Sequence, residues 1–177
     1  MAALAAGVDP ELMEERWHPA AERRQLVPLV LIGVPLYIGH LVIAGLDAGR
    51  YHWSRTRPGV QIAALALSAA SWALVDWAMV ANRFFSSVVR IQAERGHHLV
   101  TTGPYRYVRH PGYVGGIVGF LAGPVVLGSW WALAPLAPIV LFVLWRTAAE
   151  DRFLCAWLPG YASYAGRVRY RLVPGIW

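Results

Sequence analysis

The amino-acid sequence predicts an all-α, polytopic membrane protein with about four transmembrane helices, the last two forming a short helical hairpin. Of its 177 residues, 57% are hydrophobic and only 15% are charged, whereas soluble domains carry about 25% charged residues. The apolar residues gather in long uncharged stretches, and a helix of about 20 such residues crosses about 30 Å of hydrocarbon. The chain therefore has room for one domain and no more than about five spans, which excludes a large multidomain enzyme.

The first half of the chain predicts a polar lead-in followed by two spans. Residues 1–25 are polar and mixed in charge, so we expect an interfacial segment there and no cleavable signal peptide. Residues 26–46 are uncharged and long enough for the first span. A polar linker leads to the second span at residues 60–81, whose one charge is Asp76. We expect a single membrane domain from residue 26 to residue 177.

The second half predicts the helical hairpin. The stretch from Gly112 to Trp145 holds no charge over 34 residues, which is too long for one span and slightly short for two. We expect spans at residues 112–128 and 130–147, joined by a turn at Gly128-Ser129-Trp130-Trp131, because a Gly-Ser break there meets tryptophans that favour the membrane interface. Residues 148–177 are polar and basic and should form a C-terminal segment outside the hydrocarbon.

The arginine distribution predicts the orientation. If the loop at residues 82–110 is cytoplasmic, the inside holds three arginines in the N-terminal segment, five in the loop and five from Arg146 onward, against three in the outside linker. Cytoplasmic segments of membrane proteins carry the excess of basic residues. We therefore expect both termini, and a site assembled from the loop and the C-terminal segment, on the cytoplasmic side.

The basic residues and the single cysteine exclude several chemistries. All sixteen basic residues are arginines, so Schiff-base catalysis by lysine is excluded. Cys155 is the one cysteine and cannot form an intrachain disulfide. No Cys/His cluster has the spacing of a zinc site, so we expect no metal. We also expect no nucleic-acid partner.

Three polar features invite a functional interpretation, and each also has a structural one. Asp76 lies near the end of the second span, where it should face the bundle, a wet cavity or a partner such as Arg83. His40 fits a neutral imidazole hydrogen-bonded inside the bundle. The segment from His97 to Tyr113 combines histidines, tyrosines, arginines and two Gly/Pro turns directly before the hairpin. Composition alone would equally fit an interfacial loop anchored to lipid headgroups.

A resemblance favours function for this last segment. The motif is HHLVTTGPYRYVRHPGYVG, followed about 30 residues later by Arg146, Glu150, Asp151 and Leu154 and then by PGYASYAGRVRYRLVPGIW. In order and spacing it resembles the isoprenylcysteine carboxyl methyltransferase family of membrane enzymes, and the phospholipid methyltransferases are similar in the same places. The resemblance covers about half of the chain, from Arg90 to Trp177. The first two spans match only in hydropathy.

The resemblance implies S-adenosylmethionine as methyl donor and a lipophilic small-molecule or prenylated acceptor. Membrane lipids are expected as further partners. It implies a cofactor pocket formed by Gln92, His97, Leu99, Val100, Tyr105, His110, Pro111, Gly112, Tyr113 and Glu150. Arg146 would orient the acceptor. His98 cannot be separated from His97, and Gly112 stands where the family often has a larger residue.

Arg146 and Glu150 also have a plain interpretation, because their i, i+4 spacing suits a surface ion pair. Asp151 fits a solvated neighbour. Two tyrosines and three arginines of the C-terminal segment could close a site or simply bind anionic headgroups, and the second role needs no special geometry; these residues are Tyr161, Tyr164, Arg167, Arg169 and Arg171.

Three other functions remain open from sequence. A phospholipid N-methyltransferase acting on an ethanolamine-type amine would need a site that removes an ammonium proton, whereas Arg146 suits a carboxylate. An NADPH-dependent membrane reductase would need a diphosphate site, and the sequence offers no glycine-rich phosphate loop. A non-catalytic membrane scaffold would bind no nucleotide.

Overall fold

The computed structural model describes Val27 and residues 29–177. These residues form helices and loops, with no strand among them. The expected interfacial segment at residues 1–25 lies outside the described residues. The predicted all-α fold is confirmed for the part that is described.

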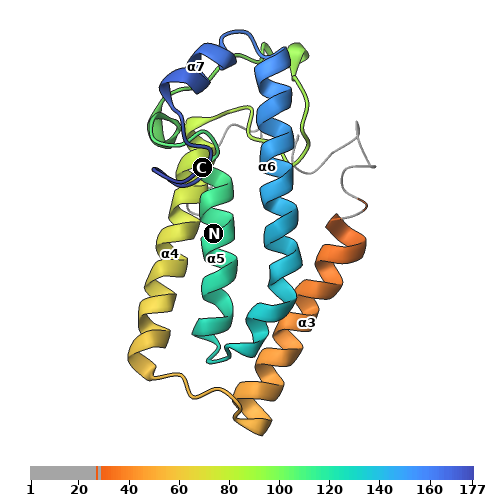
Figure 1. Ribbon diagram of the computed structural model, residues 1–177, viewed down its shortest axis with the longest axis vertical. Helices are drawn as coiled ribbons and strands as arrows, with labels where there is room; N and C mark the ends of the chain where they lie inside the picture. The colour runs from red at the N-terminus through yellow and green to blue at the C-terminus, as the bar shows by residue number, and fades with distance from the viewer. Residues whose placement is uncertain (1–26, 28) are drawn as a thin grey trace.

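Four apolar helical rods form the bundle, and short helices occupy one end (Figure 1). The first rod joins η2 (Leu29–Gly33), α3 (Val34–Ala44) and η3 (Gly45–Tyr51); the second is α4 (Pro58–Ala81), the third α5 (Pro111–Val126), and the fourth joins η6 (Trp131–Leu136) to α6 (Ala137–Trp157). The short helices are η4 (Ala93–Arg95), η5 (Gly103–Arg106) and α7 (Tyr161–Arg167).

Three of the rods are long and apolar enough to cross a membrane, namely Val30–Tyr51, Pro58–Ala81 and Trp131–Trp157, and α5 is a shorter apolar helix. Large apolar side chains such as Leu31, Ile62 and Leu141 are exposed on them, as expected where hydrocarbon covers the surface. The chain is therefore a multi-pass membrane protein.

Two rods run beyond the expected spans. The first continues to Tyr51 because the carboxylate of Asp47, which is fully buried, is satisfied by neighbouring hydroxyl groups. The last continues to Trp157, ten residues beyond residue 147. Its added turns carry Glu150 and Asp151, which point polar groups into the protein rather than into lipid.

Helices α4 and α5 pack closely because α5 presents glycine to α4. A Cβ atom at Gly115 would lie 2.5 Å from the carbonyl oxygen of Ser71 and 2.7 Å from Cγ2 of Val75, so only glycine allows this approach. One turn further, Gly119 faces the Trp72 indole. Small residues at this spacing are the usual means by which membrane helices bring their backbones together.

The hairpin turn lies between Val126 and Trp131, close to the predicted position. Polar side chains from other segments form hydrogen bonds with its backbone carbonyls. Gln61 Nε2 donates to the Val126 carbonyl and Thr56 Oγ1 donates to the Gly128 carbonyl, both at 3.0 Å. Ser129 Oγ donates to Asp47, which also accepts from the backbone and hydroxyl of Ser54 at 2.6 Å. This end of the bundle is closed by hydrogen bonds among the linker, the first rod and the turn.

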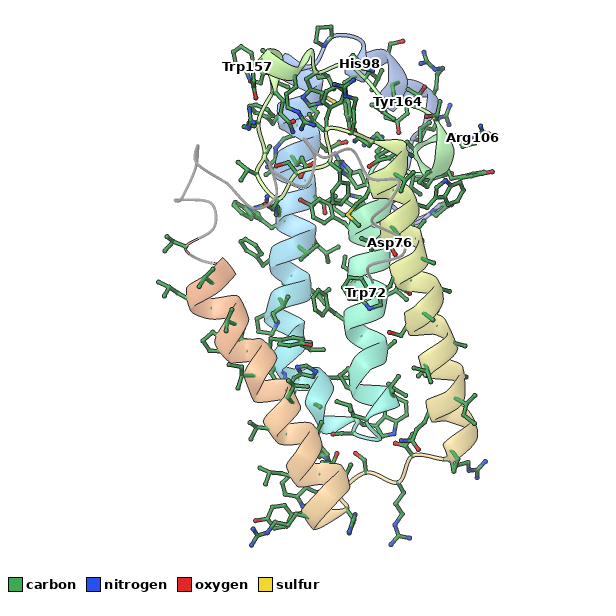
Figure 2. The ribbon with its side chains drawn as sticks, turned by 180° about the vertical axis from the view of Figure 1, so that it is seen from behind. Trp72, Asp76, His98, Arg106, Trp157 and Tyr164 are labelled. Atoms are coloured by element: carbon green, nitrogen blue, oxygen red, sulfur yellow. The ribbon has the colours of Figure 1, made fainter. Side chains whose placement is uncertain are left out.

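The opposite end carries the long loop at residues 82–110 and the C-terminal segment around α7, folded over the ends of α5 and α6 (Figure 1). Figure 2 shows His98, Arg106, Trp157 and Tyr164 gathered at this end, with Asp76 and Trp72 lower along α4. The chemistry-bearing motifs of the sequence therefore meet at one end of the bundle.

Candidate active site

A cavity of about 320 Å³ lies at the loop-bearing end, between α5, α6, α7 and the loop. Nine of the eleven predicted site residues line it: His97, Leu99, Val100, Tyr105, His110, Gly112, Tyr113, Arg146 and Glu150. The other walls are largely apolar and aromatic, and they reach along α5 and α6 to Phe120 and Phe142. The pocket thus combines a polar end with an apolar extension at the depth of the membrane spans.

Gln92 and Pro111 do not line the pocket but are buried behind its wall. Gln92 Nε2 donates to the Phe84 carbonyl at 2.9 Å, and its backbone N–H donates to His97 Nδ1 at 3.2 Å. Pro111 occupies the first turn of α5, where a missing N–H costs nothing. Both residues shape the backbone from which lining side chains project.

A row of three polar side chains crosses the polar end of the pocket. Arg146 Nε donates to the Tyr113 hydroxyl at 2.9 Å, and that hydroxyl donates to Glu150 Oε2 at 2.7 Å. Arg146 Nη2 also donates to the Ser87 carbonyl. Arg146 and Glu150 therefore do not form the simple surface ion pair that their spacing allows, because Tyr113 stands between them.

Asp151 is the centre of a second polar group behind this row. It is 2% exposed, and its carboxylate accepts from Nε and Nη2 of Arg109 at 2.7 and 2.9 Å, from Arg171 at 2.8 Å and from the Tyr161 hydroxyl at 3.0 Å. His110 Nε2 lies 3.3 Å away. The expectation of a solvated Asp151 is wrong, because the C-terminal segment folds back over it.

The same group attaches the C-terminal segment to the loop. Arg109 Nη1 donates to the carbonyls of Val168 and Arg169 at 2.8 and 2.9 Å, and its backbone N–H donates to the Tyr170 carbonyl at 3.0 Å. Burial alone would lower the pKa of Arg109, but the hydrogen bond and charge of Asp151 raise it. Arg109 is therefore a charged clamp, a role that its place in an interfacial loop did not reveal.

Tyr161 and Tyr164 line the pocket, and both are buried, so they close the site instead of facing headgroups. Burial raises the pKa of Tyr164 to about 12 and, with the nearby Asp151, raises that of Tyr161 further. Burial also raises the pKa of Tyr105. At neutral pH these hydroxyls remain protonated, and that of Tyr164 donates to the Tyr105 carbonyl at 2.6 Å.

His97 and His98 both line the pocket, and His98 is the more exposed of the two. The His97 ring stacks on Phe84 with centroids 4.5 Å apart. Burial lowers the pKa of His97, and the neighbouring His98 lowers it further. A neutral imidazole agrees with Nδ1 accepting from the Gln92 backbone.

Two earlier candidates lie outside the pocket. His40 is 4% exposed and its Nδ1 is 2.5 Å from the Tyr37 carbonyl, as the structural interpretation expects. Asp76 is half-buried on α4 and is not among the lining residues.

The fold and the pocket together define a polytopic membrane protein with a half-polar, half-apolar chamber at one end of its bundle. A family model described as phospholipid methyltransferase matches residues 60–157, and this range includes Arg146, Glu150 and most of the lining residues. The chain belongs to the phospholipid methyltransferase family and is by class a membrane methyltransferase.

Several curated proteins are similar to the chain. Cobalt-zinc-cadmium resistance protein CzcN of Cupriavidus metallidurans is 32% identical over 156 residues, which cover 85% of this chain and 68% of that protein. Protein-S-isoprenylcysteine O-methyltransferase B of Arabidopsis thaliana is 31% identical over 123 residues, 68% of this chain and 56% of the relative. The Saccharomyces cerevisiae protein-S-isoprenylcysteine O-methyltransferase is 31% identical over 102 residues, 50% of this chain and 38% of the relative.

The chain therefore spans between about a third and just over half of the isoprenylcysteine O-methyltransferases it matches. No solved structure matches the chain. The resemblance drawn from the loop motif is confirmed at the level of the family.

Proposed function

We propose that the protein transfers the methyl group of S-adenosylmethionine to the carboxylate of a lipophilic, isoprenylcysteine-like acceptor. The observation that carries this proposal is the row Arg146–Tyr113–Glu150, which places a guanidinium and a carboxylate in one pocket with a hydroxyl between them. The similarity to proteins named isoprenylcysteine O-methyltransferases supports the choice of acceptor.

The lining residues suit the cofactor. S-adenosylmethionine supplies an electrophilic methyl group on a sulfonium ion. Glu150 would hold the ammonium of its amino-acid part through a charge-assisted hydrogen bond. Aromatic side chains such as Tyr105 and Tyr161 would pack on its apolar parts and on the sulfonium. The remaining cofactor contacts would come from the loop and the start of α5, through His97, Leu99, Val100, His110, Gly112 and Tyr113.

Arg146 would hold the acceptor carboxylate with its planar fork of donors. The carboxylate held in this way would accept the methyl group that the cofactor supplies, with the electrons of the broken C–S bond left on sulfur. No proton moves, so the site needs no general base. Holding both reactants in line supplies most of the acceleration, and the buried tyrosines exclude water from the opposing charges.

The pocket's apolar extension between α5 and α6 would take the beginning of the acceptor's hydrocarbon chain. Phe120 and Phe142 lie there, at the depth of the spans. The arginine distribution supports a cytoplasmic position for this end of the molecule and for both termini.

An ethanolamine-type phospholipid is the second candidate acceptor, and the description of the matching family model favours it. Its ammonium must lose a proton before it can attack, and it would gain nothing from a guanidinium at the acceptor position. A reductase would require NADPH binding, and a scaffold would bind no nucleotide.

Two experiments test these assignments. Isothermal titration of the purified protein should show binding of S-adenosylhomocysteine and none of NADPH; the reverse would support a reductase, and no binding of either would support a scaffold. Transfer of a radiolabelled methyl group into a lipid extract, with the product identified by mass spectrometry, should give a methyl ester. A labelled methylamine would overturn the carboxylate acceptor.

A further inference from the structure

We propose that Phe85 and Gly112 together form a width filter beside Arg146, which selects acceptors by the bulk of the group next to their carboxylate. This inference rests on the proposed function and deepens it. A Cβ atom at Gly112 would lie 2.5 Å from Cε2 and 2.8 Å from Cζ of Phe85, closer than carbon atoms can approach. The phenyl ring therefore fills the space that a side chain at position 112 would occupy.

Several hydrogen bonds hold the backbone that leads into Phe85. The Phe85 N–H donates to the Asn82 carbonyl at 3.0 Å, and the Phe84 N–H donates to the Asn82 side chain at 3.0 Å. Phe84 itself is 4% exposed, and its carbonyl accepts from Gln92. Because this turn is held from several directions, the ring of Phe85 can respond to a neighbour mainly by rotating.

The filter lies where the cofactor contacts proposed for Gly112 meet the acceptor's side of the pocket. Arg146 is held by the Ser87 carbonyl and by the Tyr113 hydroxyl, and these groups belong to the same two short segments that carry Phe85 and Gly112. Phe85 and Gly112 both line the pocket. An acceptor whose carboxylate meets Arg146 would then carry its adjacent carbon in the part of the pocket that Phe85 and Gly112 line.

The chemical class selected would be prenyl thioether carboxylic acids, distinguished by what their carbon next to the carboxylate carries. Two probes differ there alone: N-acetyl-S-farnesylcysteine bears an acetamido group, and S-farnesyl-3-thiopropionic acid bears hydrogen. Removing the ring by Phe85→Ala should raise the ratio of kcat/KM for the first acid over the second by about fivefold or more, within the range that differential contacts in a pocket produce.

Gly112→Ala should have the opposite effect, because the new methyl group displaces the ring into the pocket. It should lower the same ratio by about fivefold in the wild-type background and by less than about twofold in the Phe85→Ala background. Non-additivity of this size is expected only for side chains in contact.

Gly116→Ala is the matched control. Gly116 lies one turn further along α5 and also lines the pocket, but a Cβ atom there meets nothing within 4 Å. Its effect on the ratio should be the same with and without the ring of Phe85.

The test is the complete double-mutant cycle in the full-length protein, with thermal unfolding and S-adenosylhomocysteine affinity measured for each variant. Coupling of positions 85 and 112 in the acceptor ratio, without coupling of 85 and 116, supports the filter. Additive effects at 85 and 112 overturn it, and so does coupling seen only in S-adenosylhomocysteine affinity, which would assign the pair to the cofactor. If the wild-type protein binds S-adenosylhomocysteine but methylates neither acid, the proposed acceptor class fails and the filter fails with it.

Discussion

Arg109 holds Asp151 with one edge of its guanidinium, Nε to Oδ1 at 2.7 Å and Nη2 to Oδ2 at 2.9 Å. The two residues are 42 positions apart and join the loop to α6. Both side chains are almost fully buried, so the pair is shielded from water and salt. Forked arginine–carboxylate pairs are among the strongest polar contacts in proteins.

Asp151→Asn should therefore destabilise the protein by about 3 to 5 kcal/mol, because the buried guanidinium of Arg109 would be left without a counter-ion. The half-buried Arg171 would lose its partner as well. Denaturant unfolding in mixed micelles measures this loss. The matched control is Glu94→Gln, which removes an exposed carboxylate from its pair with Arg90 and should change stability hardly at all. An equal effect of the two substitutions would contradict this structural role of Asp151.

Arg146→Lys should reduce methyl transfer to a prenylcysteine-like acid by one to three orders of magnitude, about 1.4 to 4 kcal/mol of barrier, because lysine keeps the charge but loses the planar fork. S-adenosylhomocysteine affinity should stay nearly constant. Arg152→Lys serves as control, since Arg152 is exposed on the same helix. Full activity of Arg146→Lys on the acid, or activity confined to a lipid amine, would favour the phospholipid-type acceptor.

Glu150→Gln should weaken S-adenosylhomocysteine binding by about 1.5 to 3 kcal/mol, the contribution of a hydrogen bond to a charged group. Titration calorimetry measures it, and the unfolding midpoint should remain close to that of the wild type. Tyr113→Phe removes the bridging hydroxyl but keeps the ring, and it should weaken binding less than Glu150→Gln. Unchanged affinity in Glu150→Gln would remove this carboxylate from the cofactor site.

Cysteine labelling tests the orientation. In a Cys155→Ser background, a cysteine at the exposed Arg55 should react with an impermeant maleimide from outside, and one at the exposed Ala93 should react only after permeabilisation. Ser54 is unsuitable because its hydroxyl and N–H both bind Asp47. Labelling of the Ala93→Cys protein from outside would invert the topology.

Protonation of His97 in acid should lower the stability of the protein. Burial lowers the pKa of His97 from the ordinary 6.5, so the folded protein favours the neutral ring. The stability that this preference contributes is fully present above pH 6.5. It is lost as the pH falls below that value. Between pH 7 and about pH 5.5 the unfolding temperature should drop more in the wild type than in His97→Gln. His98→Gln should give a drop between those two, because it removes the smaller cause of the lowered pKa and leaves the burial of His97 in place. Parallel curves for all three proteins would exclude His97 as the source.

The sequence could predict the spans because an uncharged stretch such as residues 60–81 has few alternatives to crossing the membrane. The loop residues were predictable for another reason, since their motif preserves the order of a known family. Glu150 and Asp151 show where prediction stopped. They are adjacent carboxylates whose side chains point about 100° apart on a helix, and only the return of the C-terminal segment decides that one faces the pocket and the other a buried guanidinium.

The contacts of Arg109 and Phe85 could not be predicted from the sequence for the same reason. Arg109 donates to backbone carbonyls within residues 165–169. Every residue has such a carbonyl, so the sequence does not indicate which ones act as acceptors. The contact of Phe85 with Gly112 depends on how the turn at Asn82 directs the chain.

The hydrogen bonds at the hairpin turn bear on how the protein fits its bilayer. Helix α5 has 16 residues and at 1.5 Å per residue covers about 24 Å, some 6 Å less than a typical hydrocarbon core. A turn that ends short of the boundary would expose carbonyls to a medium that cannot solvate them. Here Gln61 and Thr56 take the place of water at the Val126 and Gly128 carbonyls. We therefore expect the protein to accommodate the hydrophobic mismatch itself, without thinning the surrounding lipid at that point.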